Sequence, residues 1–529
     1  MKRVILVLSG AFVLCFWSKV FAESFGCPKP YFSHNPMSAI SFAKTYGGTS
    51  YDYAFSVQQT SDGGYIVAGY TASFGAGGWD IFLIKTYANG NVQWAKTYGG
   101  IDFDFAYSVQ QTSDGGYIVA GYTYSFGAGW YDIFLIKTDA NGNVQWAKTY
   151  GGTSRDYAYS VQQTSDGGYI VAGGTRSFGA GYYDIFLIKT DANGNVQWAK
   201  TYGGTDYDWA YSVQQTSDGG YIVAGETRSF GAGDIFLIKT DANGNVIWTK
   251  TYGGTSASSV HQTSDGGYIV AGGTSSFGAG GSDIFLIKTD ANGNVQWAKT
   301  YGGTSDDYAH SVQQTSDGGY IVAGRTFSFG VINGDIFLIK TDANGNVIWA
   351  KTYGGTYWDD ASSVQQTSDG GYIVAGYIDS FGAGGDNFFL IKTDANGNIG
   401  SCSIVRSVSP TANTVSPTVT TPSLSVSSVS PTVYSVSPTV TTPTPTVHEP
   451  CPLSISESCQ IASGIITLYK GGIKITKSGE FEVKVYNISG VMVKSIKGKN
   501  ELKLELSRGV YFVEVISGGK VIREKVVIR

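Results

Sequence analysis

The residues of this chain best suited to chemistry are its four histidines. They are His34, His261, His310 and His448, and no two of them stand at a spacing typical of a metal site or a catalytic triad. His261 and His310 stand where other copies of a repeated unit carry Gln and Tyr or Phe. We therefore expect no histidine-based metal or nucleophilic site.

Aspartate recurs at two positions of the repeated unit. One set precedes the first strand-like segment: Asp52, Asp104, Asp156, Asp208, Asp307 and Asp359. The other set opens the third segment: Asp80, Asp132, Asp184, Asp234, Asp283 and Asp335. A glycosidase needs one close carboxylate pair in an unusual setting, and these sets single out no pair. Their recurrence predicts a structural role, in which the carboxylates cap loops between units.

A third acidic motif is Asp-Ala-Asn-Gly-Asn, first complete at Asp139–Asn143. Its oxygens at alternate positions suggest calcium, but its Gly is misplaced for a calcium loop and no Glu follows at the right distance. A hairpin turn capped by its own Asp explains the motif better. We expect no cofactor and no metal, with calcium as the alternative.

Three arginines, Arg176, Arg228 and Arg325, lie near the same loop in three units. This arrangement resembles an anion-binding site of the sialidase kind, but the other partners of such a site are not recognisable. The sequence therefore favours a protein that is not an enzyme. A polysaccharide-active enzyme with a polar active site is one alternative, and a structural component of the cell envelope is another.

The elements that position these residues come from an internal repeat. The letters TYGG start at residues 45, 97, 149, 201, 251, 300 and 352, a period near 50 that is typical of propeller blades. The second copy divides into "FAYSVQQTS", "GYIVAGYTYS", "DIFLIKTD" and "NVQWAKTY", with hairpin signals at "SDGG" and "ANGN". A β-helix has much shorter rungs. We predict an all-β fold, a seven-bladed β-propeller.

The first copy of the repeat is incomplete. Residues 38–48, "SAISFAKTYGG", have no turn before them and carry Phe42 where the other copies carry Trp94, Trp146, Trp198, Trp248, Trp297 and Trp349. The seventh unit stops at Cys402 without a fourth strand. Since an open propeller leaves two unpaired edges, we expect the N-terminal strand to complete the last blade.

The cysteines left after export are Cys27, Cys402, Cys451 and Cys459, which allow three pairings. Ring closure would bring Cys27 close to Cys402, so we expect a disulfide there. Cys451 and Cys459 would then close a small local loop.

Composition divides the chain further. Residues 1–22 read as a signal peptide, because their apolar run is short for a membrane anchor, and an N-terminal segment, 23–37, follows. The propeller spans 38–402. Residues 403–450 are rich in Pro, Thr and Ser, which predicts an extended, solvated linker without a core. Residues 451–529 regain alternating strand patterns, which predicts a small β-sandwich.

The distribution of charge along the chain limits the partners that it can bind. Residues 464–529 hold 13 Lys plus Arg against 6 Glu, although the whole chain has a net charge of −5. The body of the chain is therefore acidic, which argues against nucleic acid as a partner. No other segment could serve as a transmembrane anchor, and we expect a monomeric propeller.

The copies of the repeat differ mainly after TYGG and around "SFGAG". In an up-and-down blade these loops share one face, so we expect one uniform and one diversified face. The diversified face is rich in aromatics: Tyr51, Tyr53, Trp79, Phe103, Phe105, Trp130, Tyr131, Tyr157, Tyr182, Tyr183, Tyr207, Trp209, Tyr308, Tyr357 and Trp358. Tyr and Trp on rigidly held loops are typical of surfaces that bind protein or sugar rings, and packing between loops is the alternative.

Two families resemble parts of this chain. "DIFLIKTDANGNVQWAKTYGG" with "SVQQTSDGGYIVAGYT" resembles SBBP-type repeats of secreted bacterial β-propellers, and more loosely kelch-like propellers, over residues 40–400. "VYN" at 485–487, "GVYFV" at 509–513 and "KVVI" at 525–528 resemble the type IX secretion system type A sorting domain, although its usual Asn-Pro element is replaced by "YKGGIKI".

These resemblances imply where the protein acts. The first is specific for the fold and implies no single activity. The second implies an encounter with the secretion machinery and a location that is secreted or on the outer cell surface. Together with the aromatic loops they predict a binding or adhesion protein that recognises an extracellular protein or a polysaccharide.

Overall fold

The computed structural model describes residues 41–451, apart from 232, 255, 331–332, 401 and 423, and residues 466–469, 472–487, 492–506, 509–517 and 520–528. The expected signal peptide, the segment 23–37, Cys27 and Cys459 lie outside the described residues. The chain divides into two compact units, Met1–Ser454 and Ile455–Arg529. All regular elements of the described residues are strands. A search of the same residues for a helix capable of spanning a membrane found none.

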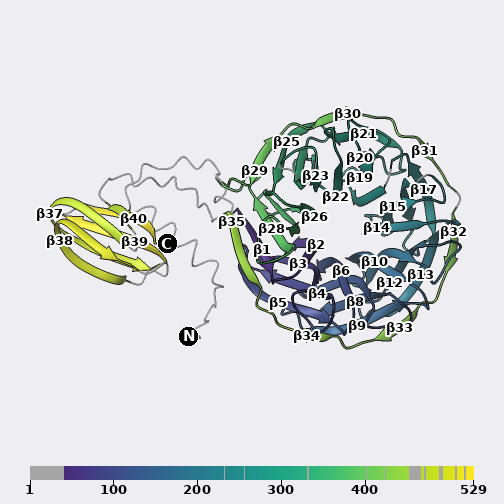
Figure 1. Cartoon of the computed structure of the whole chain (residues 1–529), viewed down its shortest axis with the longest axis horizontal. Coiled ribbons are helices and arrows are strands. Elements are labelled where there is room, and N and C mark those ends of the chain that lie inside the picture. Colours follow the sequence, from purple (N-terminus) through teal and green to yellow (C-terminus); the bar gives the residue numbers. More distant parts are fainter. Residues whose placement is uncertain are drawn as a thin grey trace, which may run out of the picture. The chain divides into compact units, whose positions relative to one another are not determined.

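Seven similar antiparallel sheets form a propeller-like ring in the first unit (Figure 1). Each sheet holds four strands of the repeat and a fifth strand at its outer edge. In six sheets the four strands follow chain order from the centre outward, as the sequence predicts, and in the seventh the fourth strand is β1.

The first and second positions of each sheet are occupied by two sets of strands. The innermost strands are β2 (Asp52–Gln59), β6 (Asp104–Gln111), β10 (Asp156–Gln163), β14 (Asp208–Gln215), β18 (Ser256–Gln262), β22 (Asp307–Gln314) and β26 (Asp359–Gln366). The second strands are β3 (Tyr65–Thr71), β7 (Tyr117–Thr123), β11 (Tyr169–Thr175), β15 (Tyr221–Thr227), β19 (Tyr268–Thr274), β23 (Tyr320–Thr326) and β27 (Tyr372–Ile378).

Two further sets occupy the third and fourth positions. The third strands are β4 (Asp80–Thr86), β8 (Asp132–Thr138), β12 (Asp184–Thr190), β16 (Asp234–Thr240), β20 (Asp283–Thr289), β24 (Asp335–Thr341) and β28 (Asn387–Thr393). The fourth strands are β5 (Val92–Gly99), β9 (Val144–Gly151), β13 (Val196–Gly203), β17 (Val246–Tyr252), β21 (Val295–Gly302), β25 (Val347–Tyr353) and β1 (Phe42–Gly47).

Turn chemistry and burial explain why each unit folds this way. Gly115 in "SDGG" has φ 84° and Gly142 in "ANGN" has φ 73°, a backbone region that residues with a Cβ rarely adopt. The apolar second and third strands are covered on both sides, because Ile118 and Leu135 of one sheet pack with Val171 and Phe186 of the next. The core of the ring is thus a series of contacts between neighbouring sheets.

The incomplete first repeat supplies β1, which pairs antiparallel with β28 and so provides the fourth strand of the seventh sheet, as the sequence predicts. Every residue of β1 is buried. The Tyr46 hydroxyl donates to the carbonyl of Gly90 in the first sheet at 2.6 Å. One short N-terminal strand therefore joins the seventh sheet to the first.

The segment expected to be a solvated linker is instead a belt around the ring, which corrects that prediction (Figure 1). We call residues 403–451 the belt. Its strands are β29 (Val405–Val408), β30 (Thr411–Thr414), β31 (Val419–Thr420), β32 (Ser425–Ser428), β33 (Thr432–Ser435), β34 (Thr439–Thr441) and β35 (Thr446–Cys451). They pair in turn with β25, β21, β17, β13, β9, β5 and β1, one strand on each sheet.

The belt has a seven-residue repeat of its own, which matches the spacing between neighbouring sheets of the ring. Val408, Val415, Val429 and Val436 stand seven or fourteen residues apart, and each packs against the cluster between two sheets. Seven extended residues span about 23 Å. The amides of Val415, Val429 and Val436 each donate to a carbonyl of the ring at 3.0 Å.

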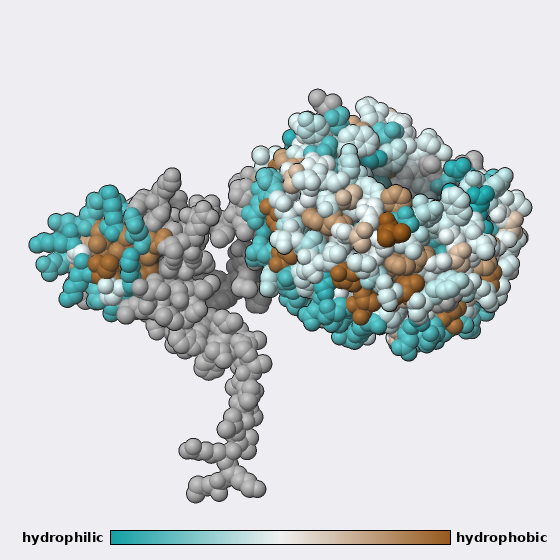
Figure 2. Space-filling view, turned by 60° about the horizontal axis from the view of Figure 1, so that its bottom comes forward, coloured by the Kyte–Doolittle hydropathy of each residue, from teal (hydrophilic) through white to brown (hydrophobic). Residues whose placement is uncertain are grey.

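The outer surface of the ring stays mostly polar. Apolar belt residues that remain exposed, such as Val440 at 40% and Val447 at 41%, are isolated among Thr and Ser. Figure 2 shows, on its visible side, small brown patches scattered among pale and teal residues. Single apolar residues of this kind are ordinary on protein surfaces and mark no interface.

A disulfide joins Cys402 to Cys451, with 5.4 Å between their Cα atoms. The predicted pairs, Cys27 with Cys402 and Cys451 with Cys459, are therefore wrong. The physical reason is the course of the belt. After one full circuit its last strand returns to the seventh sheet, beside the point where the belt began.

The C-terminal unit is a five-stranded antiparallel sheet. Its strands are β36 (Ile466–Tyr469), β37 (Gly472–Asn487), β38 (Met492–Glu505), β39 (Gly509–Ser517) and β40 (Lys520–Ile528). They follow the order β36-β37-β39-β40, and β38 also pairs with β37. Within the described residues the strands form one sheet instead of the predicted two-sheet sandwich. A single cluster that includes Ile473, Phe481, Val485 and Val513 buries its apolar side chains.

Candidate ligand-binding face

The two faces of the ring differ as the sequence predicts. On the uniform face, side chains of the fourth strand of one sheet donate hydrogen bonds to the "ANGN" turn of the next sheet. The Tyr150 hydroxyl donates to the Gly194 carbonyl at 2.7 Å, and Lys148 donates to Asn195 Oδ1 at 2.8 Å. Asp139 accepts hydrogen bonds from the amides of Asn141 and Asn143 and caps its own turn. The motif considered for calcium is thus occupied by turn hydrogen bonds.

The repeated aspartates hold the loops of the opposite, diversified face. Asp104 accepts from the Gly100 amide at 2.8 Å, from the Ser125 hydroxyl at 2.7 Å and from the Thr123 hydroxyl. Asp132 accepts from the Ala128 amide at 2.8 Å. These bonds match the predicted capping role, and they fix the loops that carry the variable residues.

These buried carboxylates make stability depend on pH. Burial first, and then the charge of a neighbouring aspartate, raises the pKa of Asp104 and Asp132 to about 6 and that of Asp359 to about 7. In the unfolded chain the pKa is about 3.9. Between these values the folded state binds more protons, so stability should fall as the pH rises from about 4 to 7.

We expect the midpoint of urea unfolding to be higher at pH 5 than at pH 7.5. The variant Asp359→Asn should have a smaller difference, because an amide has nearly the shape of the carboxyl group and does not titrate in this range. Asn387 already replaces the aspartate that begins the other third strands. An unfolding midpoint that rises from pH 5 to 7.5 would show that the buried acids are not protonated as their surroundings imply.

The predicted binding residues all lie on the diversified face, but their exposure differs. Those largely exposed are Tyr51, Phe103, Trp130, Tyr182, Tyr357 and Trp358. Those half-buried are Tyr53, Trp79, Phe105, Tyr131, Tyr157, Tyr207, Trp209 and Tyr308. Tyr183 is buried. Some rings therefore face solvent while others pack between loops, so the packing interpretation holds for part of the set, and recognition of a ligand stays a prediction.

Most of these rings touch one another across sheet boundaries. Tyr183 stacks on Trp209 with centroids 4.3 Å apart, and Tyr182 stacks on Tyr207 at 5.4 Å. Tyr70 of the first sheet lies 4.7 Å from Phe105 of the second, and Tyr122 of the second lies 4.7 Å from Tyr157 of the third. An aromatic network therefore connects the first four sheets. Trp358 lies apart from it and contacts Phe327 at 5.5 Å.

A second layer of rings beneath these loops was not identified from the sequence. Tyr70 and Tyr122 lie near the ends of β3 and β7, and Tyr107 and Tyr159 point from the innermost strands. Tyr122 packs edge-on against Tyr157 at 4.7 Å, and burial raises its pKa. The signal was present, because the residue after "YIVAG" varies among units while its neighbours do not.

The aromatic network ends at a polar cluster on the sixth and seventh sheets. Asp360, 5% exposed, takes the position that carries an aromatic ring in most units. Its carboxylate lies 3.2 Å from Arg325 Nη1 and 3.3 Å from His310 Nε2, and it accepts from the Tyr377 hydroxyl at 3.2 Å. Two of the arginines compared with a sialidase site have separate partners, since Arg325 pairs with Asp360 and Arg228 pairs with Glu226 at 3.3 Å.

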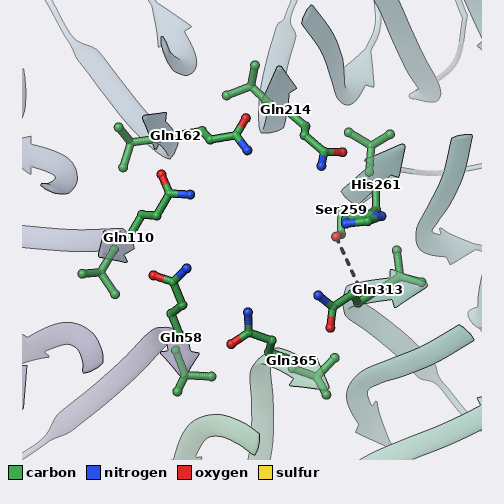
Figure 3. Close-up of a pocket in the computed structure, with 15 residues that line it drawn as sticks. Gln58, Gln110, Gln162, Gln214, Ser259, His261, Gln313 and Gln365 are labelled. Carbon is green, nitrogen blue, oxygen red and sulfur yellow. Dashed lines mark hydrogen bonds between the residues drawn. The ribbon is translucent and has the colours of Figure 1, made fainter. Parts of the chain in front are cut away.

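An open pocket of about 350 Å³, which we call the pore, lies at the centre of the ring (Figure 3). Six glutamines and His261 line it, one from each innermost strand: Gln58, Gln110, Gln162, Gln214, Gln313 and Gln365. Gln110 Oε1 accepts from the backbone amide of Gln163 in the next sheet at 2.5 Å, and the other glutamines bond likewise. Because a backbone N–H can only donate, this bond fixes each side-chain amide with its nitrogen toward the centre.

His261 is the exception in the pore. Burial lowers its pKa, so the imidazole is neutral near pH 7. Its Nδ1 has no hydrogen-bond partner among the described residues. The glutamine ring thus ties neighbouring sheets together at six places, and one sheet lacks this bond.

Comparison with protein families gives two matches. Residues 37–279 match the model of holdfast attachment protein D. Residues 469–529 match the secretion system C-terminal sorting domain. The second match confirms the resemblance of the C-terminal residues to a sorting domain, and the resemblance to SBBP-type repeats stays a prediction about the kind of propeller.

Individual relatives are distant. A regulatory protein, FlaEY, of Caulobacter vibrioides is 29% identical over 111 residues, which are 18% of this chain and 12% of that protein. The chain therefore spans only a small part of the curated relative it matches. A protein of unknown function from Dyadobacter fermentans has a TM-score of 0.35 at 11% identity, covering 67% of this chain and 100% of its own.

A glycoside hydrolase of family 32 from Bifidobacterium adolescentis has a TM-score of 0.25 at 9% identity, covering 92% and 95% of the two chains. Neither structural likeness is close enough to support an argument about this protein. The two family matches do bear on location. The protein is a secreted or cell-surface protein with a C-terminal sorting domain.

Proposed function

We propose that the protein is a non-catalytic adhesion protein whose ring, a closed seven-bladed propeller, binds an extracellular glycan or protein through the aromatic residues of its diversified face. The sorting domain and the holdfast attachment match support a surface adhesion role. The observation that carries the proposal is the exposure of large rings on loops that the repeated aspartates hold rigid.

Several of the rings are suited to recognition because they remain exposed on loops that hydrogen bonds hold in place. Trp130 is 59% exposed, Tyr182 58% and Trp358 48%, although each belongs to a loop anchored by partly buried hydrogen bonds to an aspartate. Pre-ordered aromatic side chains lose little conformational entropy on binding, and they contribute much of the energy of recognition surfaces. A rigid face with several such rings can hold an extended ligand at more than one point.

The contacts of the polar cluster support binding over catalysis. Asp360 is engaged by Arg325, His310 and Tyr377 at once, so its carboxylate already has three partners within the described part of the chain. A glycosidase of the usual kind needs two carboxyl groups facing the scissile bond. Asp360 therefore fits a role in shaping the edge of the face.

A triple variant tests the function. Binding to a glycan array or to an extracellular surface should fall by about a hundredfold in the variant that combines Trp130→Ala, Trp209→Ala and Trp358→Ala. Each stacked ring contributes roughly 1 kcal/mol or more to binding. The control is Trp94→Ala with Trp146→Ala on the uniform face, which should bind as the wild type does. Unchanged binding by the triple variant, or turnover of a polysaccharide by the wild type, would contradict the proposal.

A further inference from the structure

The cations of the ring fall into two groups that differ in position. Lysines recur at fixed places of the repeat and have structural partners, as Lys137 does with Asp114 at 2.8 Å and Lys148 with Asn195 at 2.8 Å. The arginines between residues 41 and 401 do not belong to the repeat. They are Arg155, Arg176, Arg228 and Arg325, and all four lie on the diversified face.

Two of these arginines are neutralised and two are not. Arg228 forms an ion pair with Glu226 at 3.3 Å, and Arg325 forms one with Asp360 at 3.2 Å. In the described part of the chain, no ion pair is found for Arg155 or Arg176. An arginine without a carboxylate, in a chain whose body is acidic, is available for an external anion.

Arg155 is also built into an aromatic surface. Its guanidinium lies 5.6 Å from the ring of Trp130 and 6.0 Å from that of Tyr131. Tyr124, 39% exposed, lies 5.3 Å from Tyr131 and 6.3 Å from Trp130. We call Tyr124, Trp130, Tyr131 and Arg155 the Trp130 platform.

The backbone holds the Trp130 platform in place. The Trp130 amide donates to the Ser154 carbonyl at 3.3 Å, and Tyr131 forms a β-bridge with Arg155. Asp132 and Asp156, both buried, begin the strands that follow these loops. These contacts therefore hold the two loops that carry Trp130 and Arg155 side by side before any ligand arrives.

We propose that the Trp130 platform binds an acidic polysaccharide, with a sugar ring stacked on Trp130 and the sugar's carboxylate or sulfate group paired with Arg155. This inference rests on the proposed function and adds the class of ligand. The exposed indole provides the flat face that the C–H groups of a pyranose require. The guanidinium offers two parallel N–H donors to an anionic group on that ring.

A polysaccharide fits these contacts better than a protein partner does. Protein interfaces centre on a desolvated apolar core, whereas Trp130 is 59% exposed and follows the small residues Gly127, Ala128 and Gly129. A repeating acidic chain could also reach Arg176, which is exposed on the adjacent loop. Several weak contacts along one chain would add to the overall affinity.

The experiment compares two ligands that differ only in charge, using the full-length wild-type protein. Oligogalacturonate and its methyl ester present the same sugar rings with and without carboxylate charges. We expect oligogalacturonate to bind at least tenfold more tightly by calorimetry at low salt, and to lose this advantage as salt is raised. A sulfated dextran oligomer determines whether sulfate serves as well as carboxylate.

A matched pair of variants locates the charge. Arg155→Gln should abolish the preference for the acidic ligand. Arg228→Gln, the same change at a neutralised arginine on the same face, should leave the preference within about twofold of wild type. Thermal unfolding of both variants verifies that they are folded.

The outcomes separate this inference from the proposed function. Equal binding of charged and esterified ligands, lost in the triple tryptophan variant, would overturn the acidic specificity and leave the aromatic face as the binding site. A preference that survives in Arg155→Gln would also overturn the inference. Failure of every glycan to bind, together with unchanged adhesion of the triple variant, would overturn both.

Discussion

Replacing Cys451 by serine is expected to loosen the belt from the ring. The disulfide closes a loop with a sequence separation of 49, for which the chain-entropy estimate is about 4 kcal/mol. Most belt side chains are exposed, and each belt strand pairs with only one neighbour. Without the disulfide the belt can open from β35 onward, one sheet at a time.

Hydrogen exchange measures this opening. Amides of residues 403–451 should exchange up to about a thousandfold faster in Cys451→Ser, whereas amides of the second and third strands should change far less. Cys402→Ser and the double variant should behave alike, because either change removes the same bond. If the belt amides keep their wild-type protection, strand pairing alone holds the belt, and the disulfide has no mechanical role.

Removal of β1 should have a still larger effect. Deleting Phe42–Gly47 leaves the buried strand β28 without its partner and leaves β35 with nothing to pair with. Phe42, Ala43 and Tyr46 are each at most 1% exposed, so the deletion also empties the contact between the seventh and first sheets. An exposed apolar strand edge favours aggregation. We expect little or no soluble monomer.

A single substitution in β1 and a peptide that replaces the strand test the same role of β1. Phe42→Ala should lower the free energy of unfolding by about 3 to 4 kcal/mol, while Tyr51→Ala, at a half-exposed ring, should cost well under 1 kcal/mol. A synthetic peptide of residues 38–48 should restore soluble monomer to the deletion variant by adding a strand to β28. A deletion variant that is monomeric and as stable as wild type would show that β1 does not close the ring.

The repeat itself could be read from the sequence because its signals are local. A short stretch of sequence is enough to identify each Asp-Gly or Asn-Gly turn, each apolar central strand and the incomplete repeat "SAISFAKTYGG". Counting the strands then predicts the observed pairing of β1 with β28. The diversified face followed from the same division into four strands. In an up-and-down blade, every second connection lies on the same side of the sheet, so the variable loops must share one face.

The belt could not be read in this way, because its strands pair with partners far away in the sequence. The frequent Pro has weak strand propensity, and pairing with the fourth strands of the seven sheets makes these residues extended strands. One signal was available, since Pro410, Pro417, Pro431 and Pro438 stand seven or fourteen residues apart. The disulfide prediction was wrong for the same reason, because the course of the belt decides which cysteines meet.

The candidate site was predicted only at the level of loops. Local sequence identifies variable aromatics, but not which rings pack beneath others, so Tyr183 was grouped with Tyr182 although only Tyr182 is exposed. The ion pairs that neutralise Arg228 and Arg325 while leaving Arg155 unpaired depend on contacts between strands. These differences determine the proposed ligand, and they required the structure.

Hydroxyl-radical footprinting of the full-length protein, with and without a bound polysaccharide, tests the central claim most directly. Both faces carry tryptophans, so one sample contains its own control. We predict that Trp130 and Trp358 become protected on binding, while Trp94 and Trp146 on the uniform face stay as reactive as before. Protection of the uniform-face tryptophans alone would place the binding site on the opposite side of the ring and contradict the account.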